Sequence, residues 1–248
     1  MGRVIAIARR EFFAHFGSPA AWVAIAIFLS LLGVTFFFNM PFFIVKPAFF
    51  LAREASLRWL FEWMMFLFTI ILPAISMRLL AEERKLGTME ILLTLPVDEF
   101  DVVVGKLVGS IGFLLVALSL TLFYPLMLVI LGQPDPGPIL GGYIGVTLAG
   151  AAYLAIGLLA SSWTSSQITA FIIAIAICAG MSFADRIPEA LGLHSLPLLD
   201  AFSFGSHFQS IARGVIDTRD ILYFLGVLFT AVAWTIFSVE SRKWKKGA

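Results

Sequence analysis

The chain has 248 residues, of which 60% are hydrophobic and only 13% are charged, whereas a soluble globular domain is about a quarter charged. So little charge excludes a water-soluble domain as the main part of the chain, and the net charge of +1 gives no indication of nucleic-acid binding. The single cysteine, Cys178, lies in an apolar run and cannot form an internal disulfide. Since a chain in lipid must satisfy its backbone hydrogen bonds internally, the composition predicts an all-α integral membrane protein.

Long apolar runs predict six transmembrane helices in a single domain of residues 1–248. About 20 apolar residues are needed to cross roughly 30 Å of hydrocarbon. The fourth and fifth runs share a stretch of 49 residues without a formal charge, divided only by the polar segment Ser161–Gln167. No secretory signal peptide is expected, because charges precede the first run and no small-residue cleavage pattern follows it. The expected spans are residues 20–38, 59–80, 103–131, 139–162, 167–184 and 221–240.

Lysine and arginine predict the orientation of these spans. With a cytoplasmic N-terminus, eleven of the 17 basic residues fall in the terminal segments and in the loops on the cytoplasmic side. Positive residues are enriched on that side of a membrane. We therefore expect a multi-pass protein of the cell (inner or cytoplasmic) membrane with both termini in the cytoplasm.

Two segments outside the spans have helical periodicity. Residues 3–16 place Val4/Ile5, Ala8, Phe12 and Phe16 on one face, with Arg9, Arg10 and Glu11 elsewhere on the wheel, which predicts an interfacial amphipathic helix. Between the last two spans, Phe204, Phe208, Ile211 and Val215 recur at spacings of 4, 3 and 4. This pattern predicts an interfacial or re-entrant helix on the outer side.

Small residues at intervals of four mark packing faces on two spans. Gly141, Gly145 and Ala149 form one such face, and Gly105 and Gly109 form another. Small residues allow close approach of helices in lipid. The pattern fits packing within the chain or a dimer face.

Motifs for catalysis or cofactor binding are weak. Gly105-Lys106 resembles the end of a phosphate-binding loop, but Phe100 stands where the first glycine is required and Leu107 replaces the Ser/Thr. Glu62 is the only acid inside a predicted span, which makes it a candidate for a substrate pathway. It also lies four residues after Arg58, so an interfacial ion pair is an alternative. Lys106, near the inner boundary, can extend to the interface.

The most informative stretch runs from Arg78 to Lys106. A helix is expected to end near Gly87, a short apolar helix covers Met89–Leu95 and stops at Pro96, and Asp98 can cap the third span. Glu82 and Glu83 lie near a helix C-terminus, where the dipole disfavours acids, so Arg84, Lys85 or a partner's cation must compensate. Such a segment fits a docking surface for a soluble partner or a solvated interfacial loop.

The run Glu82–Val97 closely resembles the cytoplasmic loop of ABC-2 type ABC-transporter permeases. His207–Leu225 is similar to their outer loop and sixth helix, and Ala8–Phe12 is similar to their N-terminal elbow helix. Among subgroups the motifs resemble most the gliding-motility-associated permeases and the related copper-enzyme maturation permeases. The similarity covers essentially the whole chain in order.

This resemblance implies the membrane subunit of an ATP-driven transporter, expected to be an exporter, that pairs with a second permease subunit in a homo- or heterodimer. A separate ABC ATPase subunit would bind ATP and Mg²⁺, so this chain would be no enzyme and would bind no cofactor; a periplasmic or auxiliary membrane subunit is a further conceivable partner. A coupling helix would seat in the ATPase, flanked by polar contacts. A second, smaller contact would come from Ser162, Thr164 and Ser165. The docking residues would be Glu82, Glu83, Arg84, Gly87, Thr88, Met89, Glu90, Ile91, Leu92, Leu95 and Pro96.

Two other classes compete with this interpretation. An ATP-independent secondary transporter or channel usually has broken helices in matching halves or several charges along a path; neither is clear here, although Tyr124-Pro125 can kink the third span. A membrane enzyme needs polar catalytic groups clustered near one interface, and none stands out.

Overall fold

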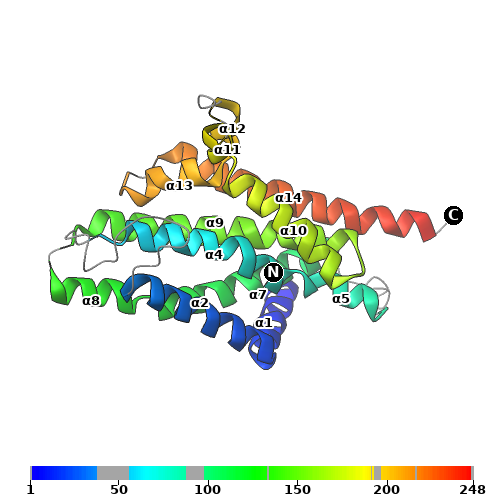
Figure 1. Ribbon diagram of the computed structural model, residues 1–248. Coiled ribbons are helices and arrows are strands. Elements are labelled where there is room, and N and C mark those ends of the chain that lie inside the picture. Colours follow the sequence, from blue (N-terminus) through cyan, green and yellow to red (C-terminus); the bar gives the residue numbers. More distant parts are fainter. Residues whose placement is uncertain are drawn as a thin grey trace.

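The computed structural model describes residues 2–37, 56–87, 98–132, 134–190, 192, 197–215 and 217–246. All regular secondary structure within these ranges is α-helical (Figure 1). The helices are α1 (Gly2–Gly17), α2 (Pro19–Phe37), α4 (Arg58–Ser76), α5 (Arg78–Lys85), α7 (Glu99–Leu120), α8 (Phe123–Leu131), α9 (Pro136–Trp163), α10 (Gln167–Ser182), α11 (Arg186–Ala190), α12 (Pro197–Phe202), α13 (Phe204–Ala212) and α14 (Thr218–Lys246).

Five helical stretches of the described chain are long and apolar enough to cross a membrane. They are Pro19–Phe37, Arg58–Lys85, Glu99–Ile130, Pro136–Trp163 and Thr218–Ser241. The expected fifth span, residues 167–184, corresponds to α10, an apolar helix of only 16 residues. At 1.5 Å per residue it is about 24 Å long, shorter than the roughly 30 Å of a bilayer core. The protein is therefore an all-α integral membrane protein with five full-length candidate spans and one short apolar helix among its described residues.

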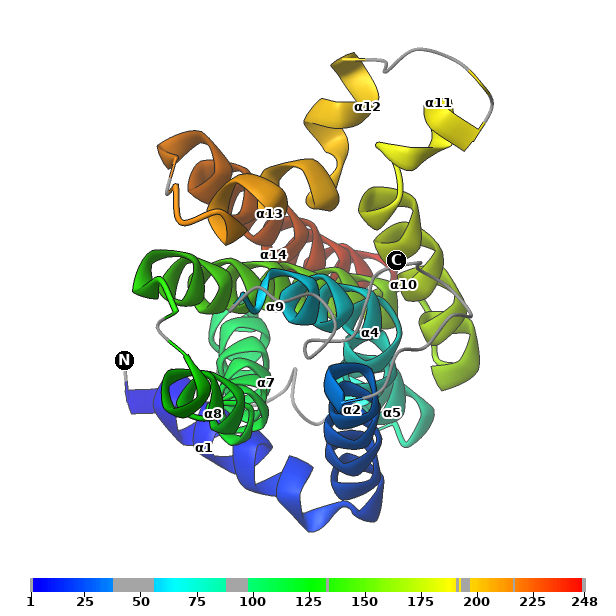
Figure 2. The ribbon, with the colours of Figure 1, turned by 60° about the vertical axis from the view of Figure 1, so that its left-hand side comes forward.

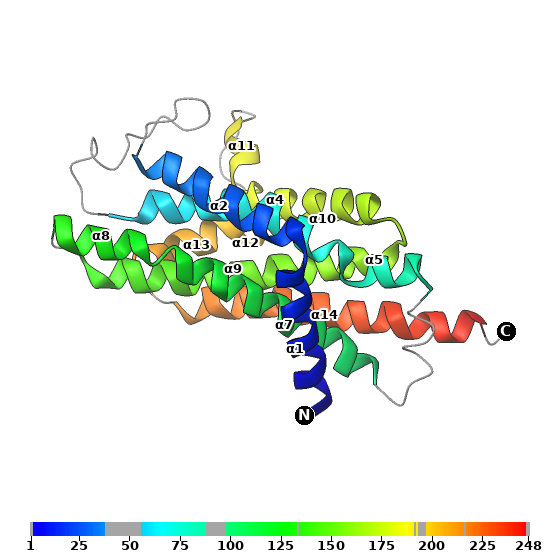
Figure 3. The same ribbon diagram turned by 90° about the horizontal axis from the view of Figure 1, so that it is seen from below.

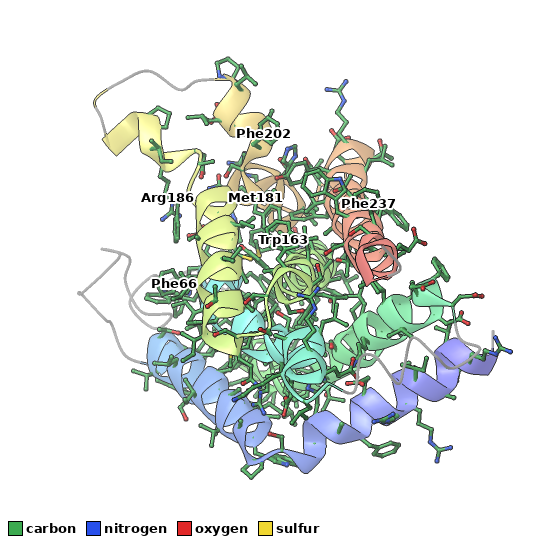
Figure 4. All side chains as sticks on the ribbon, turned by 90° about the vertical axis from the view of Figure 1, so that its right-hand side faces the viewer. Phe66, Trp163, Met181, Arg186, Phe202 and Phe237 are labelled. Carbon is green, nitrogen blue, oxygen red and sulfur yellow. The ribbon has the colours of Figure 1, made fainter. Side chains whose placement is uncertain are left out.

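Helix α9 occupies the centre of the bundle. It packs against α14, α4, α10, α13 and α7, and other helices surround it in the oblique view of Figure 2 and in the end-on view of Figure 4. From Ala149 to Ser162 every residue is buried. Alanine and glycine are frequent in this stretch, which lets neighbouring backbones approach closely and bury the helix on all sides.

The third predicted span is broken where the sequence places Tyr124-Pro125. Helix α7 ends at Leu120, a turn follows at Thr121 and Leu122, and α8 begins at Phe123. Proline has no N–H to give to the carbonyl four residues earlier, which is that of Thr121. The Tyr143 hydroxyl on α9 donates to this carbonyl oxygen at 3.0 Å, so a tertiary contact stabilises the break.

Helix α1 runs across the long helices rather than along them (Figure 3). It packs mainly on α7, where glycines of α7 leave room for it. A Cβ added at Gly109 would lie 2.8 Å from the Ala8 carbonyl oxygen, and one at Gly105 would lie 2.7 Å from the Ile7 side chain. The small-residue face at the start of the third span is thus used for packing within the chain.

The second small-residue face is used in the same way by α13. A Cβ at Gly141 would lie 2.3 Å from the Ile211 carbonyl oxygen, and one at Gly145 would lie 3.0 Å from the Phe208 ring. Phe204, Phe208 and Ile211 are all buried, as their spacing predicts. Val215 lies beyond the end of α13 and is exposed, so it is not part of this face.

Candidate functional site

The predicted docking segment is flanked by two well-defined helix ends. Helix α5 continues the span α4 and ends at Lys85; Gly87 follows with φ of 71°, the left-handed conformation that favours glycine. On the other side, α7 begins at Glu99 with Asp98 in the capping position, although the Asp98 side chain makes no capping hydrogen bond within the described chain. The residues expected to seat in an ATPase lie outside the described ranges; these are Thr88, Met89, Glu90, Ile91, Leu92, Leu95 and Pro96.

Lys106 on α7, the helix after the predicted docking segment, contacts α5, the helix before it. Its Nζ lies 2.8 Å from Oε1 of Glu83 on α5 and 2.9 Å from Oε1 of Glu11 on α1. The Lys106 side chain is 3% exposed, so it does not extend to the interface as its position in the sequence suggests. A buried cation needs paired anions to offset its desolvation, and two carboxylates meet that need. The bridges connect α1, α5 and α7, and α5 and α7 are the helices that precede and follow the predicted docking segment in the chain.

Two expectations about acidic residues change with this arrangement. Glu83, predicted to be balanced by Arg84, Lys85 or a partner's cation, has Lys106 of its own chain as a partner. Glu11, predicted to lie off the apolar face of the interfacial helix, points inward to the same lysine. Neither contact has a signature in the sequence, because Glu11 lies 95 residues from Lys106 and Glu83 lies on a different helix from Lys106.

His15 extends the polar cluster towards α7. Its Nε2 lies 3.1 Å from the Ser110 hydroxyl oxygen, and that hydroxyl donates to the Lys106 carbonyl oxygen, so Nε2 carries the proton and donates to Ser110. Burial lowers the pKa of His15 from its ordinary 6.5; Arg78 and Lys106 lower it further, whereas Glu11 raises it. His15 is therefore neutral at pH 7.

The other predicted docking residues of this region lie on or after α5. Glu82 and Arg84 are half-buried, and Gly87 is exposed. Basic side chains in the last turn of α5, Arg84 and Lys85, suit the negative end of the helix dipole.

The predicted second contact lies at the same end of the molecule: both α9 and α10 contact α5, and the turn that joins α9 and α10 lies beside α5 in Figures 1 and 3. Helix α9 ends at Trp163, and Ser166 caps α10 through a hydrogen bond from the Thr169 amide. Ser162 is fully buried, Thr164 is half-buried and Ser165 is exposed. Only Thr164 and Ser165 of the predicted set are accessible at the surface.

Glu62 lies on α4 and lines a small cavity of about 60 Å³ with residues of α9, α10 and α13. Three hydroxyl groups meet in the wall of this cavity: Ser182 Oγ lies 2.5 Å from the Tyr153 hydroxyl and 3.2 Å from Thr69 Oγ1. Arg186, at the start of α11, lines it too (Figure 4). The candidate pathway residue is thus brought together with polar groups of three helices. Within the described residues, no group of His, Cys, Asp and Glu is arranged to hold a metal ion.

Comparison with protein families identifies the chain. The model described as ABC-2 family transporter protein matches residues 5–237. The chain belongs to the ABC-2 transporter family. This ABC-2 permease is accordingly a membrane component of transport, of the kind that works with ABC ATPase partners. A comparison with curated proteins finds no match.

The sequence does not predict the contact between His207 and Asp220, because His207 lacks metal-ligand spacing. His207 Nδ1 lies 2.7 Å from Asp220 Oδ1, its Nε2 lies 3.2 Å from the Ala201 carbonyl oxygen, and the Tyr223 ring stacks on it at 4.0 Å. Since Asp220 is buried, the pair fastens α13 to the start of α14. The role of His207 shown by these contacts is structural.

Proposed function

We propose that this ABC-2 permease is the membrane-spanning subunit of an ATP-driven exporter, docking a separate ATPase through residues 82–96 and pairing with a second permease subunit. ATP and Mg²⁺ belong to the ATPase. Both termini and the docking segment lie in the cytoplasm, and the protein resides in the inner membrane. At the level of subgroup, the proposal follows the resemblance to gliding-motility-associated permeases, with a periplasmic or auxiliary subunit as a further partner.

The observation that carries this proposal is the Lys106 bridge to Glu83 and Glu11. It holds the helix that enters the docking segment, the helix that leaves it and the interfacial helix α1 as one unit. Because α5 continues α4 and α7 is itself a span, a push on the segment displaces two spans together. ATP-driven closure of the ATPases can then favour one packing of the permease subunits over another.

We extend the proposal to Glu62. Its cavity lies between α4, α9 and α10, and the hydroxyl groups of Thr69, Tyr153 and Ser182 place polar groups in a wall that is otherwise mostly apolar. Polar groups of this kind within a helical bundle are typical of a substrate path.

The test uses Leu92→Asp in the full-length permease, co-expressed with the ABC ATPases encoded in the same genome. A buried, unpaired carboxylate at a docking surface costs several kcal/mol, enough to reduce association by orders of magnitude. We expect Leu92→Asp to express normally but to lose ATPase co-purification and vanadate-sensitive ATP hydrolysis. The matched control is Leu198→Asp, an exposed apolar residue on α12, which should retain both. Equal ATPase recovery from both variants, or ATP hydrolysis by the isolated permease, would contradict the proposal.

Charge reversal tests the polar flank separately. Glu83→Lys places a second cation against Lys106, so it disturbs the permease itself as well as any docking contact. Glu82→Lys is the cleaner variant, because Glu82 takes no part in the Lys106 bridge. If Glu82 is desolvated against the ATPase, we expect Glu82→Lys to weaken binding by about 2–5 kcal/mol; on a wet rim the effect is small and salt-dependent.

A further inference from the structure

A cavity of the described chain lies between α1, α2 and the α4–α5 helix. Its volume is about 660 Å³, within the roughly 300–1,000 Å³ of ligand pockets. Charged side chains lie in one part of its wall and small apolar side chains in another. The charged part includes Arg10, Arg78 and Glu82, and the apolar part includes Ala21, Ala24 and Ala74.

Some charged side chains of this cavity form ion pairs within the described chain, and others do not. Lys106 already pairs with Glu11 and Glu83, which also line the cavity. Within the described chain, neither Arg10 nor Arg78 forms an ion pair, and the hydrogen bond given by Arg78 goes to the neutral Ser18 hydroxyl at 3.3 Å. Glu82 likewise has no ion pair among the described residues. Among the described residues, two guanidinium groups and one carboxylate of this cavity therefore form no ion pair and can contact a ligand.

The cavity lies where α1 meets the start of the candidate span α2, which is the depth expected of a membrane interface. Helix α1 crosses the long helices (Figure 3), and α2 starts its path through the apolar layer two residues after α1 ends. Trp22 is 56% exposed near this junction, and its indole N–H donates to the Phe16 carbonyl oxygen at 2.8 Å, as is common for tryptophan at membrane interfaces. The alanines lie further along α2 and α4, towards the apolar layer.

We propose that this cavity is a binding site for an amine-bearing phospholipid of the phosphatidylethanolamine type. The phosphate lies between Arg10 and Arg78, since guanidinium groups bind phosphate oxygens through paired, charge-assisted hydrogen bonds. The ammonium group faces Glu82, and an acyl chain lies on the surface of Ala21, Ala24 and Ala74. Basic pockets between helices at a membrane interface are a known type of lipid site. Glu82 is shared with the proposed docking set, whereas Arg10, Arg78 and Ala24 belong to the lipid site alone, so lipid retention by these variants of the permease without its ATPase tests the site separately from docking.

The test measures lipid retention by native mass spectrometry of the full-length permease, delipidated in detergent and titrated with dioleoyl phosphatidylethanolamine. We expect one tightly held lipid per chain. Arg78→Gln and Arg10→Gln should each weaken its retention at least tenfold. Arg9→Gln is the matched control, because Arg9 neighbours Arg10 on α1 but lies over the Phe13 ring and outside the cavity lining. Arg9→Gln should retain the lipid within about twofold of the wild type.

Further variants and competing ligands test which parts of the lipid the cavity binds. Ala24→Phe fills the apolar wall and should weaken retention without removing a charge, which keeps the proposal testable if an arginine variant misfolds. Glu82→Gln should abolish any preference for phosphatidylethanolamine over phosphatidylglycerol. Undiminished retention in Ala24→Phe and Arg10→Gln overturns the site. Equal competition by soluble glycerophosphoethanolamine overturns a lipid as the ligand, and equal retention of the two lipids by the wild type overturns the amine assignment.

Discussion

Lys106 is the central residue of the ion-pair cluster at the proposed cytoplasmic end of the permease. It is almost completely buried, yet its ammonium group is shared between carboxylates from two other helices. Such a group is costly to desolvate, and the carboxylates offset that cost only while the geometry holds. The arrangement therefore contributes little net stability beyond an apolar core, but removing the lysine deprives two carboxylates of the cation that they share.

We predict that Lys106→Met lowers the free energy of unfolding by about 3 kcal/mol, because two carboxylates would lose the buried cation that they share. The thermal unfolding midpoint in detergent, followed by tryptophan fluorescence, measures this. Lys85→Met is the matched control, since Lys85 is exposed at the end of α5, and should leave the midpoint nearly unchanged. The triple variant Glu11→Gln/Glu83→Gln/Lys106→Met should recover most of the loss. Equal midpoints for the two single lysine variants would disprove the role given to Lys106.

His15 gives the same region a predictable pH dependence. Burial lowers its pKa below 6.5, with Arg78 and Lys106 adding to the effect and Glu11 opposing it. Between the lowered pKa and 6.5 the unfolded chain binds a proton that the folded chain does not, so stability falls as the pH falls through this window. We expect the unfolding midpoint to drop between pH 7.5 and 5.5, and to drop less in His15→Gln. A drop of the same size in both would show that His15 does not contribute.

At the scale of the helix, glycine positions decide how closely α9 approaches its neighbours. A Cβ at Gly157 would lie 1.7 Å from the Ser76 hydroxyl oxygen and 2.8 Å from the Ser76 Cβ, and one at Gly142 would lie 2.1 Å from the Phe61 ring. These contacts are between α9 and α4, the helix that leads into α5. The proposed docking segment is therefore connected to the centre of the bundle through a helix pair that is too closely packed to accept an added Cβ at these positions.

We predict that Gly157→Ala destabilises the permease by about 1–3 kcal/mol, the usual cost of overpacking a dense core. Gly226→Ala on α14 is the control, because a Cβ there meets nothing within 4 Å; with its helix propensity improved, it should be neutral or stabilising by up to about 1 kcal/mol. Unfolding midpoints of the two variants, compared at equal expression, test the prediction. Ser76→Gly should partly restore Gly157→Ala, and no rescue would place the strain elsewhere.

At the scale of the whole molecule, the features that can be predicted from the sequence are those with a local pattern. Charge-free runs and helical spacing predict the all-α membrane fold, the helix end at Gly87 and the buried Phe204, Phe208 and Ile211 of α13. Contacts between distant elements have no such signature: Glu11 and Lys106 read separately as an exposed acid and a lysine near the boundary. The glycine faces show the same limit, because spacing reveals close packing but not whether its partner is α1, α13 or another subunit.

Helix α10 is shorter than the five candidate spans, so the proposed topology is best tested by asking whether α10 crosses the membrane. If α10 crosses the bilayer, Ser165 before it and Arg213 after it must lie on opposite sides, and at about 24 Å it does so only with local thinning of the bilayer or shielding by protein. We predict that a membrane-impermeant maleimide labels Asp135→Cys and Arg213→Cys in intact cells, but Lys85→Cys and Ser165→Cys only after permeabilisation. All four positions are exposed, and the wild type is the unlabelled control because its one cysteine, Cys178, is fully buried. Labelling of Ser165→Cys and Arg213→Cys from the same side would mean that α10 enters and leaves by one face, leaving the C-terminus on the opposite side of the membrane from Ser165 once α14 has crossed.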